Sequence, residues 1–175
     1  MIRKAEKKDL PLLDGLYENA RHFMHTHGNP NQWNDEHPCS NDLSQDLLEG
    51  VLYVVEEAEE ILGAFVMRVG EDPTYARIDG KAWSSRGEES LVLHKVCSCG
   101  KRRGIGHIIM TFAKAQKRDI RIDTHADNRY MKALLAREGF DPLGVIYLAN
   151  GDPRDAFEYL QNEGSKEQSF KPDNA

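Results

Sequence analysis

The sequence contains few cysteines, and their small number limits the kinds of protein it can encode. Its three cysteines, Cys39, Cys97 and Cys99, form no disulfide framework, and an odd number is typical of a reducing compartment. Cys97 and Cys99 do not have the spacing of a zinc knuckle, and no second Cys or His pair follows nearby. We therefore expect a cytoplasmic protein without a metal site.

Long apolar runs and a basic excess are also missing. No uninterrupted apolar run approaches the roughly 18 residues that a membrane helix needs, and "MIRKAEKKDLPLL" has no apolar stretch of the signal-peptide type. The net charge is −6, whereas proteins that mainly bind nucleic acid normally have a basic excess. We expect neither membrane nor nucleic acid as a partner, and the acidic balance mildly favours a cationic amine.

The length suits one domain with a substantial core, followed by a polar tail. We place the domain at residues 1–161 and expect the tail, residues 162–175, to be disordered. A short N-terminal strand precedes a helix with Asp9 as its N-cap and Pro11 in its first turn. Apolar side chains then recur at helical spacing, at Leu12, Leu13, Leu16 and Tyr17.

The remaining pattern alternates between strands and helices. Further helices are predicted over residues 41–50, from Gly104, and from Asn128 to Gly139, which is a good C′ residue. Strand-like runs occupy residues 52–57, 61–69, 75–83, 90–97, 119–125, 144–150 and 153–160. The runs over 52–57 and 61–69 are expected to form a β-hairpin, and the run over 75–83 is expected to add a third antiparallel strand to it.

A cationic loop is the most informative local feature. Residues 101–103 are Lys-Arg-Arg, and they run into Gly104, Ile105 and Gly106 at the start of an apolar helix. The first turn of a helix leaves N–H groups unpaired and carries partial positive charge, which suits a phosphate. The loop matches neither the dinucleotide-binding fingerprint nor the P-loop. A solvated turn that happens to precede a helix is the alternative.

Three stretches together resemble the GNAT superfamily of acyl-CoA N-acyltransferases. "KRRGIG" resembles its pyrophosphate loop, Gln/Arg-x-x-Gly-x-Gly/Ala, with Lys101 where Gln or Arg is usual. "HKVC" resembles its bulged fourth strand, with Val96 where backbone atoms pair with the pantetheine arm. "IRIDTHADNRYMKALLAREGF" resembles the next strand and helix, with Asn128 where an amide meets the cofactor. The resemblance covers roughly residues 1–160, and the flanking stretches look like one bacterial branch of acetyltransferases.

The resemblance implies an α/β (α+β) fold, with a mixed and mostly antiparallel sheet of about six or seven strands and about four helices. It also implies acetyl-CoA as co-substrate and an N-acetyltransferase that moves the acetyl group to a primary amine. The implied CoA-binding residues are Val96, Cys97, Ser98, Lys101, Arg102, Arg103, Gly104, Ile105, Gly106, Asn128 and Met131.

Catalysis in such a fold needs a base, because only a free amine is a nucleophile. We expect this base to be His94, on the predicted strand over residues 90–97 (the motif strand), or else His125. The pleat of a regular strand would put His94 and Val96 on one face. A hydrogen-bonded structural histidine is the alternative for His94, and a turn role beside Asp127 is the alternative for His125.

The sequence leaves two possibilities for how the leaving thiolate is protonated. Many family members place a Tyr four residues before the "GF" glycine, and here that position is Leu135. Tyr147 could reach from the neighbouring strand, or the thiolate could leave unaided. The missing Tyr also keeps open a second function, a non-catalytic acyl-CoA-binding or sensor module.

The acceptor is left open by the sequence. Trp33, Tyr75 and Trp83 are candidates for its pocket, and core packing is the alternative for each. A protein N-terminus, lysine, polyamine, antibiotic or small metabolite would all fit as the acceptor. The oligomeric state is also open, and homodimers are common among such folds.

Overall fold

The computed structural model describes residues 1–34 and 37–161, which form an eight-stranded mixed sheet with four α-helices. The helices are α1 (Leu10–Thr26), α2 (Ser40–Leu48), α3 (Ile105–Lys114) and α4 (Arg129–Arg137). The strands are β1 (Ile2–Lys4), β2 (Leu52–Glu57), β3 (Glu60–Val69), β4 (Asp79–Gly80), β5 (Leu91–Ser98), β6 (Ile120–Thr124), β7 (Asp141–Tyr147) and β8 (Pro153–Tyr159). The predicted α/β architecture is confirmed, with one or two more strands than expected. The predicted tail, residues 162–175, lies outside the described residues.

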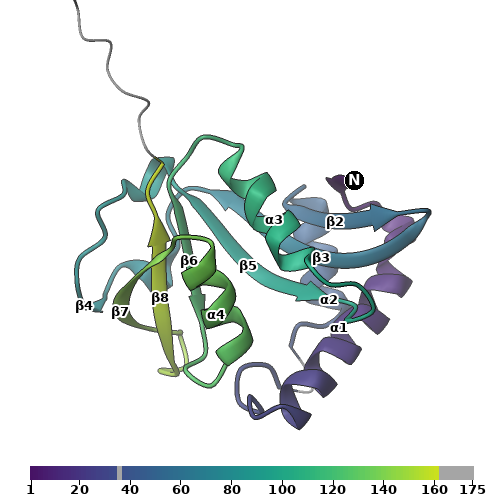
Figure 1. Cartoon of the computed structure of the whole chain (residues 1–175), viewed down its shortest axis with the longest axis horizontal. Coiled ribbons are helices and arrows are strands. Elements are labelled where there is room, and N and C mark those ends of the chain that lie inside the picture. Colours follow the sequence, from purple (N-terminus) through teal and green to yellow (C-terminus); the bar gives the residue numbers. More distant parts are fainter. Residues whose placement is uncertain (35–36, 162–175) are drawn as a thin grey trace, which may run out of the picture.

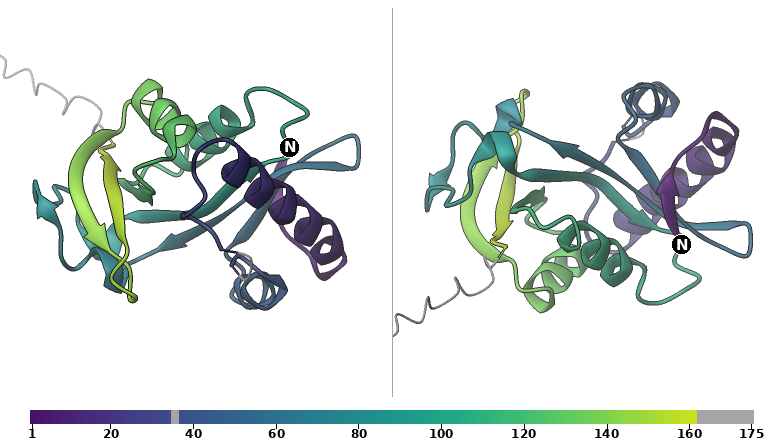
Figure 2. Two further views of the ribbon diagram at one scale, coloured as in Figure 1. Left: turned by 90° about the horizontal axis from the view of Figure 1, so that it is seen from below. Right: turned by 90° about the horizontal axis from the view of Figure 1, so that it is seen from above.

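The sheet has the order β1-β2-β3-β5-β6-β8-β7-β4, and its neighbours are antiparallel except for the parallel pair β5 and β6. Helices α3 and α4 cover one face, and α1 and α2 cover the other (Figures 1 and 2). Within the described ranges, none of the helices is long and apolar enough to cross a membrane.

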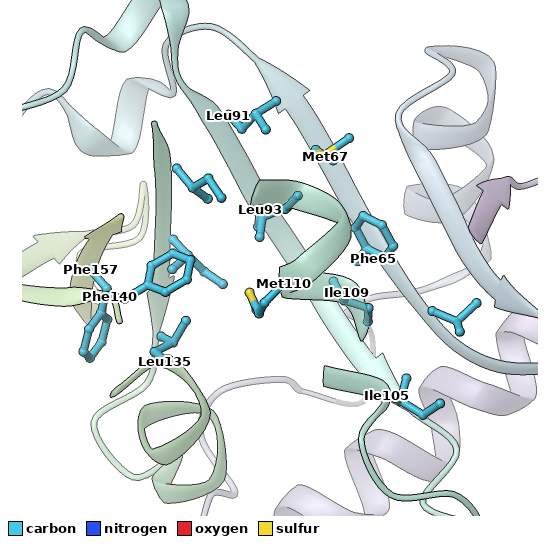
Figure 3. Close-up of a cluster of buried hydrophobic side chains, with 14 of the residues drawn as sticks. Phe65, Met67, Leu91, Leu93, Ile105, Ile109, Met110, Leu135, Phe140 and Phe157 are labelled. Carbon is cyan, nitrogen blue, oxygen red and sulfur yellow. The ribbon is translucent and has the colours of Figure 1, made fainter. Parts of the chain in front are cut away.

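Each face of the sheet has its own apolar core. Under α3 and α4 lies a cluster that includes Phe65, Leu93 and Ile109, all fully buried (Figure 3). Under α1 and α2 lies a second cluster. It buries Leu13, Leu16 and Tyr17 of the first helix, whereas Leu12 projects outward and is 60% exposed. A helix turns by about 100° per residue, so one residue of the predicted row leaves the buried stripe.

The predicted strand over residues 75–83 is wrong. Only the two residues of β4 pair, and they pair with β7 at the far edge of the sheet, while β3 pairs directly with β5. Asp72 accepts hydrogen bonds from Thr74 and caps the 3-10 turn Pro73–Tyr75. Tyr75, the first residue of the predicted strand, therefore belongs to a turn. The indole N–H of Trp83 donates to the Tyr75 carbonyl, so the segment is held as a loop.

Strands β5 and β6 separate part-way along their length. They pair only where residues 91–93 face residues 120–122, and the two ribbons then diverge (Figure 1). Among the described residues, the edge of β5 beyond Leu93 therefore has no strand beside it on the β6 side. This opening positions the candidate site.

A β-bulge in β5 determines which side chains face the opening. His94 pairs with Val66 and Cys97 with Ala64, so Lys95 and Val96 together oppose a single residue of β3, and Lys95 has φ 52°. Directly paired residues share a face, which places His94 with Cys97 on the α1 side, while Val96 packs into the α3 core. The expectation that His94 and Val96 share a face is therefore wrong, because the bulge breaks the pleat between them.

The bulge is held from the opposite layer. The Tyr17 hydroxyl donates to the Lys95 carbonyl at 2.7 Å, and the Lys95 ammonium pairs with the carboxylate of Asp46 in α2. Both contacts come from helices far away in sequence. Helices α1 and α2 thus fix the backbone of the motif strand at the point where it turns away from β6.

Candidate active site

A groove of about 590 Å³ runs between the end of α1, the splayed end of β5 and the starts of α3 and α4. Seven of the predicted CoA-binding residues line it: Val96, Cys97, Ser98, Gly104, Gly106, Asn128 and Met131. Residues that the resemblance implied for CoA, from β5, the glycine loop and the start of α4, are thus brought together along one groove.

The N-terminus of α3 forms one end of the groove. Gly104 is the N-cap, with φ 86°, and its carbonyl accepts the N–H of Ile108 at 3.0 Å. The N–H groups of residues 105–107 precede that bond and so have no partner within the helix. Ile105 itself is buried in the core, which leaves only its backbone for a ligand.

Gly106 has a packing role that the loop motif did not predict. A β-carbon at this position would lie 2.6 Å from Cδ2 of Leu134. Gly106 therefore lets α3 and α4 approach closely, and any contribution to phosphate binding comes in addition to this packing.

The three loop cations lie outside the groove lining. Lys101 pairs with Glu60 at 2.7 Å, and Arg102 pairs with Glu57, so both bind the β2–β3 hairpin. Arg103 is exposed. A phosphate at the start of α3 would therefore meet backbone N–H groups, and two of the three cations are already paired with carboxylates of the hairpin.

A second pocket, of about 400 Å³, opens where β5 and β6 separate, and we call it the histidine pocket. Its lining includes Trp33, Asp72, His94, Asp123 and Arg154. Val96 and Met131 line both the histidine pocket and the groove, so the two spaces meet at these side chains.

His94 lies between two carboxylates in this pocket. Its Nε2 is 2.8 Å from Oδ2 of Asp72, and its Nδ1 is 3.8 Å from Oδ1 of Asp123. The Tyr75 hydroxyl donates to Asp123 at 2.6 Å. The His94 side chain is 28% exposed, so it can exchange protons with a bound molecule. The arrangement is suited to accept and hold a proton.

The protonation of its neighbours follows from their surroundings. Burial alone would raise the pKa of Asp72, but hydrogen bonds from His94 and Thr74 outweigh it and hold that pKa well below its ordinary value. Burial, with the nearby charge of Asp123, raises the pKa of Tyr75 well above its ordinary value. Asp72 is therefore an anion and Tyr75 a neutral donor around neutral pH.

The two carboxylates were missed by the sequence reasoning. Asp123 stands in the buried strand β6 between Ile122 and Thr124, where a charged residue needs a polar neighbour. Asp72 precedes a proline at a turn, which is an N-cap signal rather than a catalytic one. Their proximity to His94 depends on the tertiary fold, and the sequence alone gave no spacing that indicates it.

Two of the predicted catalytic residues are not brought to either pocket. His125 accepts the N–H of Asp127 on its Nδ1 at 3.1 Å, in the turn before α4. The Tyr147 hydroxyl donates to Asp79 at 2.8 Å on the outside of β7. Strand alternation in β7 turns Ile146 inward and Tyr147 outward, away from His94. His125 is held in its turn, so neither residue lies in the pocket that contains His94.

The three predicted acceptor-pocket aromatics also separate. Trp33 is buried and lines the histidine pocket. Tyr75 and Trp83 stack on each other with ring centroids 5.1 Å apart, and the guanidinium of Arg121 lies 4.6 Å from the Trp83 ring. This stack supports Asp123 from behind through the Tyr75 hydroxyl and does not line the pocket.

Asn128 uses both ends of its amide within the protein. Its Oδ1 accepts the N–H of Met131 at 3.1 Å and caps α4, and its Nδ2 donates to Oε1 of Gln32 at 2.8 Å. The side chain is 7% exposed. Any contact that it makes with a cofactor is additional to this capping role.

We expect Asn128→Ala to lower the free energy of unfolding by about 0.5–2 kcal/mol, because the cap of α4 is lost. Asn128→Ser keeps a hydroxyl acceptor at the N-cap without placing a carboxylate against Oε1 of Gln32, so it should retain the stability that comes from the cap. Urea denaturation of both variants measures the difference. An equal loss in the two variants would show that the bond to Gln32, rather than the cap, is what stabilises this end of α4.

Comparison with known proteins gives a clear structural result. No protein-family model matches the sequence, and no curated protein matches it by sequence. A GNAT-family acetyltransferase from Streptococcus agalactiae 2603 superposes with a TM-score of 0.81 at 25% identity, over 93% of this chain and 96% of that one. A GNAT-family acetyltransferase from Listeria monocytogenes 4b F2365 gives 0.65 at 21% identity, over 91% and 93%. The chain has the GNAT fold.

The GNAT fold also occurs in proteins with other named activities. GphF, a GNAT-like decarboxylase solved in complex with isobutyryl-CoA, superposes with a TM-score of 0.64 at 13% identity, over 92% of this chain and 99% of that one. At this identity the likeness concerns the fold alone.

The position where many GNAT proteins carry Tyr is closed in this chain. Leu135 is fully buried in the core under α3 and α4, with no exposed surface (Figure 3). Tyr130 of α4 does line the groove, is half exposed, and packs 5.4 Å from the Phe23 ring at the end of α1. A phenol is thus present in the groove, one and a half turns before the usual position.

Proposed function

We propose that this chain transfers the acetyl group of acetyl-CoA to a primary amine, which attacks the thioester directly. The observation that carries the proposal is the meeting of two spaces at Val96 and Met131. One space has free N–H groups at a helix N-terminus, and the other holds an imidazole between two carboxylates. An anion-binding groove that joins a basic site suits an acyl-CoA and an amine.

The groove fits a CoA thioester at more than one point. The side chain of Asn29 lines it and is 4% exposed, and among the described residues its Oδ1 has no hydrogen-bond partner. A pantetheine arm carries amide N–H groups, and a rotation of the Asn29 side chain toward the groove would let this acceptor meet one of them. The start of α3 supplies donors for phosphate at the other end. When bound, acetyl-CoA supplies a thioester whose acyl carbon is open to nucleophiles.

The residues of the histidine pocket would prepare the amine. His94 accepts the ammonium proton, directly or through water, and Asp72 holds the ring and stabilises the imidazolium that results. The edge of β5 beyond Leu93 has no described strand beside it on the β6 side, so an N–H group there would be a donor for an acyl oxygen.

A covalent acyl-enzyme on Cys97, one of the two cysteines that line the groove, is disfavoured. Burial raises the pKa of Cys97 to about 12, so its sulfur is a protonated thiol at neutral pH. The thiolate is the nucleophilic form of cysteine. This supports direct attack by the amine.

Two further parts of the proposal have their own support. The three free cysteines support a cytoplasmic location. The GphF complex with isobutyryl-CoA supports the use of a CoA thioester and leaves acyl-chain length to be measured.

The test is a thiol-release assay with the full chain, acetyl-CoA and a panel of amines. We expect release of CoA that depends on the amine, with acetylated amine detected by mass spectrometry in equal amount. A reaction without amine measures background hydrolysis, and isobutyryl-CoA in place of acetyl-CoA measures acyl preference.

The same assay separates the enzyme from a CoA-binding module. The core position of Leu135 is the observation that favours such a module, because the usual Tyr is lacking. Binding of acetyl-CoA by calorimetry, together with no thiol release from any amine, would favour the module and contradict the proposed enzyme.

A further inference from the structure

Arg154 is a buried cation in the histidine pocket that the catalytic proposal does not use. It is 6% exposed and lines the pocket from the start of β8. A guanidinium has five N–H donors. Here one donates to the Pro153 carbonyl at 2.8 Å and one to the Gln32 carbonyl at 3.2 Å. Among residues 1–34 and 37–161, no carboxylate lies within ion-pair distance of it.

A charge in this position is costly without an anion. Burying a guanidinium removes its hydration, and two carbonyl bonds replace only part of it. The other cations near the pocket are already paired, Lys95 with Asp46 and Lys132 with Asp155. Among residues 1–34 and 37–161, Arg154 is therefore the lysine or arginine of this pocket without a carboxylate partner, and it can meet an anionic group.

The register of the sheet places Arg154 near the basic site. Asp123 pairs with Ala156, and Arg154 lies two residues before Ala156 on the same strand, so Arg154 and Asp123 share one face. Such diagonal neighbours lie about 7–8 Å apart. The pocket thus has an acidic end, at Asp72 and Asp123 with His94, and a cationic end at Arg154.

We propose that the amine acceptor also carries a carboxylate, and that Arg154 binds this carboxylate while the amine lies beside His94. The inference rests on the proposed acetyl transfer and specifies its substrate class as a free amino acid or a related amino-carboxylate. Arginine suits this role because its planar donors match the two oxygens of a carboxylate. The pocket volume of about 400 Å³ suits a small molecule.

The test compares each acid with its own amide as the acceptor. Glycine, β-alanine and 4-aminobutanoate are each paired with the corresponding amide in the thiol-release assay over pH 7–9, and each kcat/KM is calculated for the concentration of free amine, which corrects for the different ammonium pKa values of acid and amide. We expect one acid to be preferred over its amide by about 10- to 100-fold in kcat/KM, the scale of hydrogen bonds to a charged group.

Arg154→Met should remove that preference by raising KM for the acid, with KM for acetyl-CoA unchanged. Arg154→Lys should retain part of it. Arg86→Met, at an exposed arginine outside the pocket, is the matched control and should behave as wild type.

Two results would overturn the inference. Equal loss of activity toward acid and amide in Arg154→Met would mean that Arg154 only holds the Gln32 loop. Equal kcat/KM for every acid and its amide in the wild type would also overturn it, and this measurement needs no folded variant. No turnover with any amine would overturn the proposed function and this inference with it, whereas turnover without discrimination would overturn this inference alone.

Discussion

Gly104→Val should abolish measurable CoA binding while the protein remains folded. A β-carbon at Gly104 would meet no heavy atom within 4 Å, so the new side chain would project into open space at the end of the groove. It would cover the N–H groups of residues 105–107, which we expect to bind the pyrophosphate. Each charged hydrogen bond contributes about 1.5–3 kcal/mol, so losing two or more should weaken binding by about 100-fold or more.

Backbone strain must be separated from the blocked groove. Gly104 has φ 86°, and a non-glycine residue in that region costs about 1–2 kcal/mol. Gly151 is the matched control, because it has φ 89°, its β-carbon would also meet nothing within 4 Å, and it lies in the β7–β8 turn outside the groove. Calorimetry with CoA should show loss for Gly104→Val and normal affinity for Gly151→Val. Normal affinity in both would show that the anion site lies elsewhere.

Seven of the residues that the GNAT resemblance implied for CoA lie together along the groove, because the motif that carries the resemblance is local. A strand, a glycine loop and an apolar helix follow one another directly, so their spacing can be read along the chain. The cap of α4 by Asn128 is equally local. The expectation that the loop binds an anion rests on the unpaired N–H groups at a helix start, which any sequence with this order supplies.

The catalytic side of the site could not be predicted in the same way. The bulge at Lys95 is held by Tyr17 and Asp46 of distant helices, and it reverses which face Val96 occupies relative to His94. Asp72 contacts His94 from the N-cap of the 3-10 turn Pro73–Tyr75. The sequence pattern predicted a strand over residues 75–83 and did not predict this turn. Arg154 enters the pocket through strand pairing. These contacts join segments far apart in the chain, so they cannot be predicted from the spacing of residues along the sequence.

The ionisation of the residues around His94 makes its proposed role testable by pH. The pKa of Asp72 is held well below its ordinary value and that of Tyr75 well above it, so neither titrates between pH 5 and 9. Asp123 faces the ring from β6, and Lys95 on the same strand is turned away to Asp46. A base must be deprotonated to act, so the wild-type rate should rise with pH. His37 also lines this pocket and pairs with Asp42, so the comparison with a His94 variant decides which group is responsible.

His94→Gln should lower kcat by about 10²- to 10⁴-fold, because glutamine can hydrogen-bond but cannot take up a proton at neutral pH. Affinity for CoA should stay unchanged, since His94 lines the histidine pocket and not the groove. The rise of the rate with pH should disappear in the variant. His125→Gln is the matched control: it changes a histidine outside both pockets, so its rate and pH profile should match wild type. Wild-type turnover by His94→Gln across pH 6–9 would show that the contact with Asp72 is structural and that the base is another group.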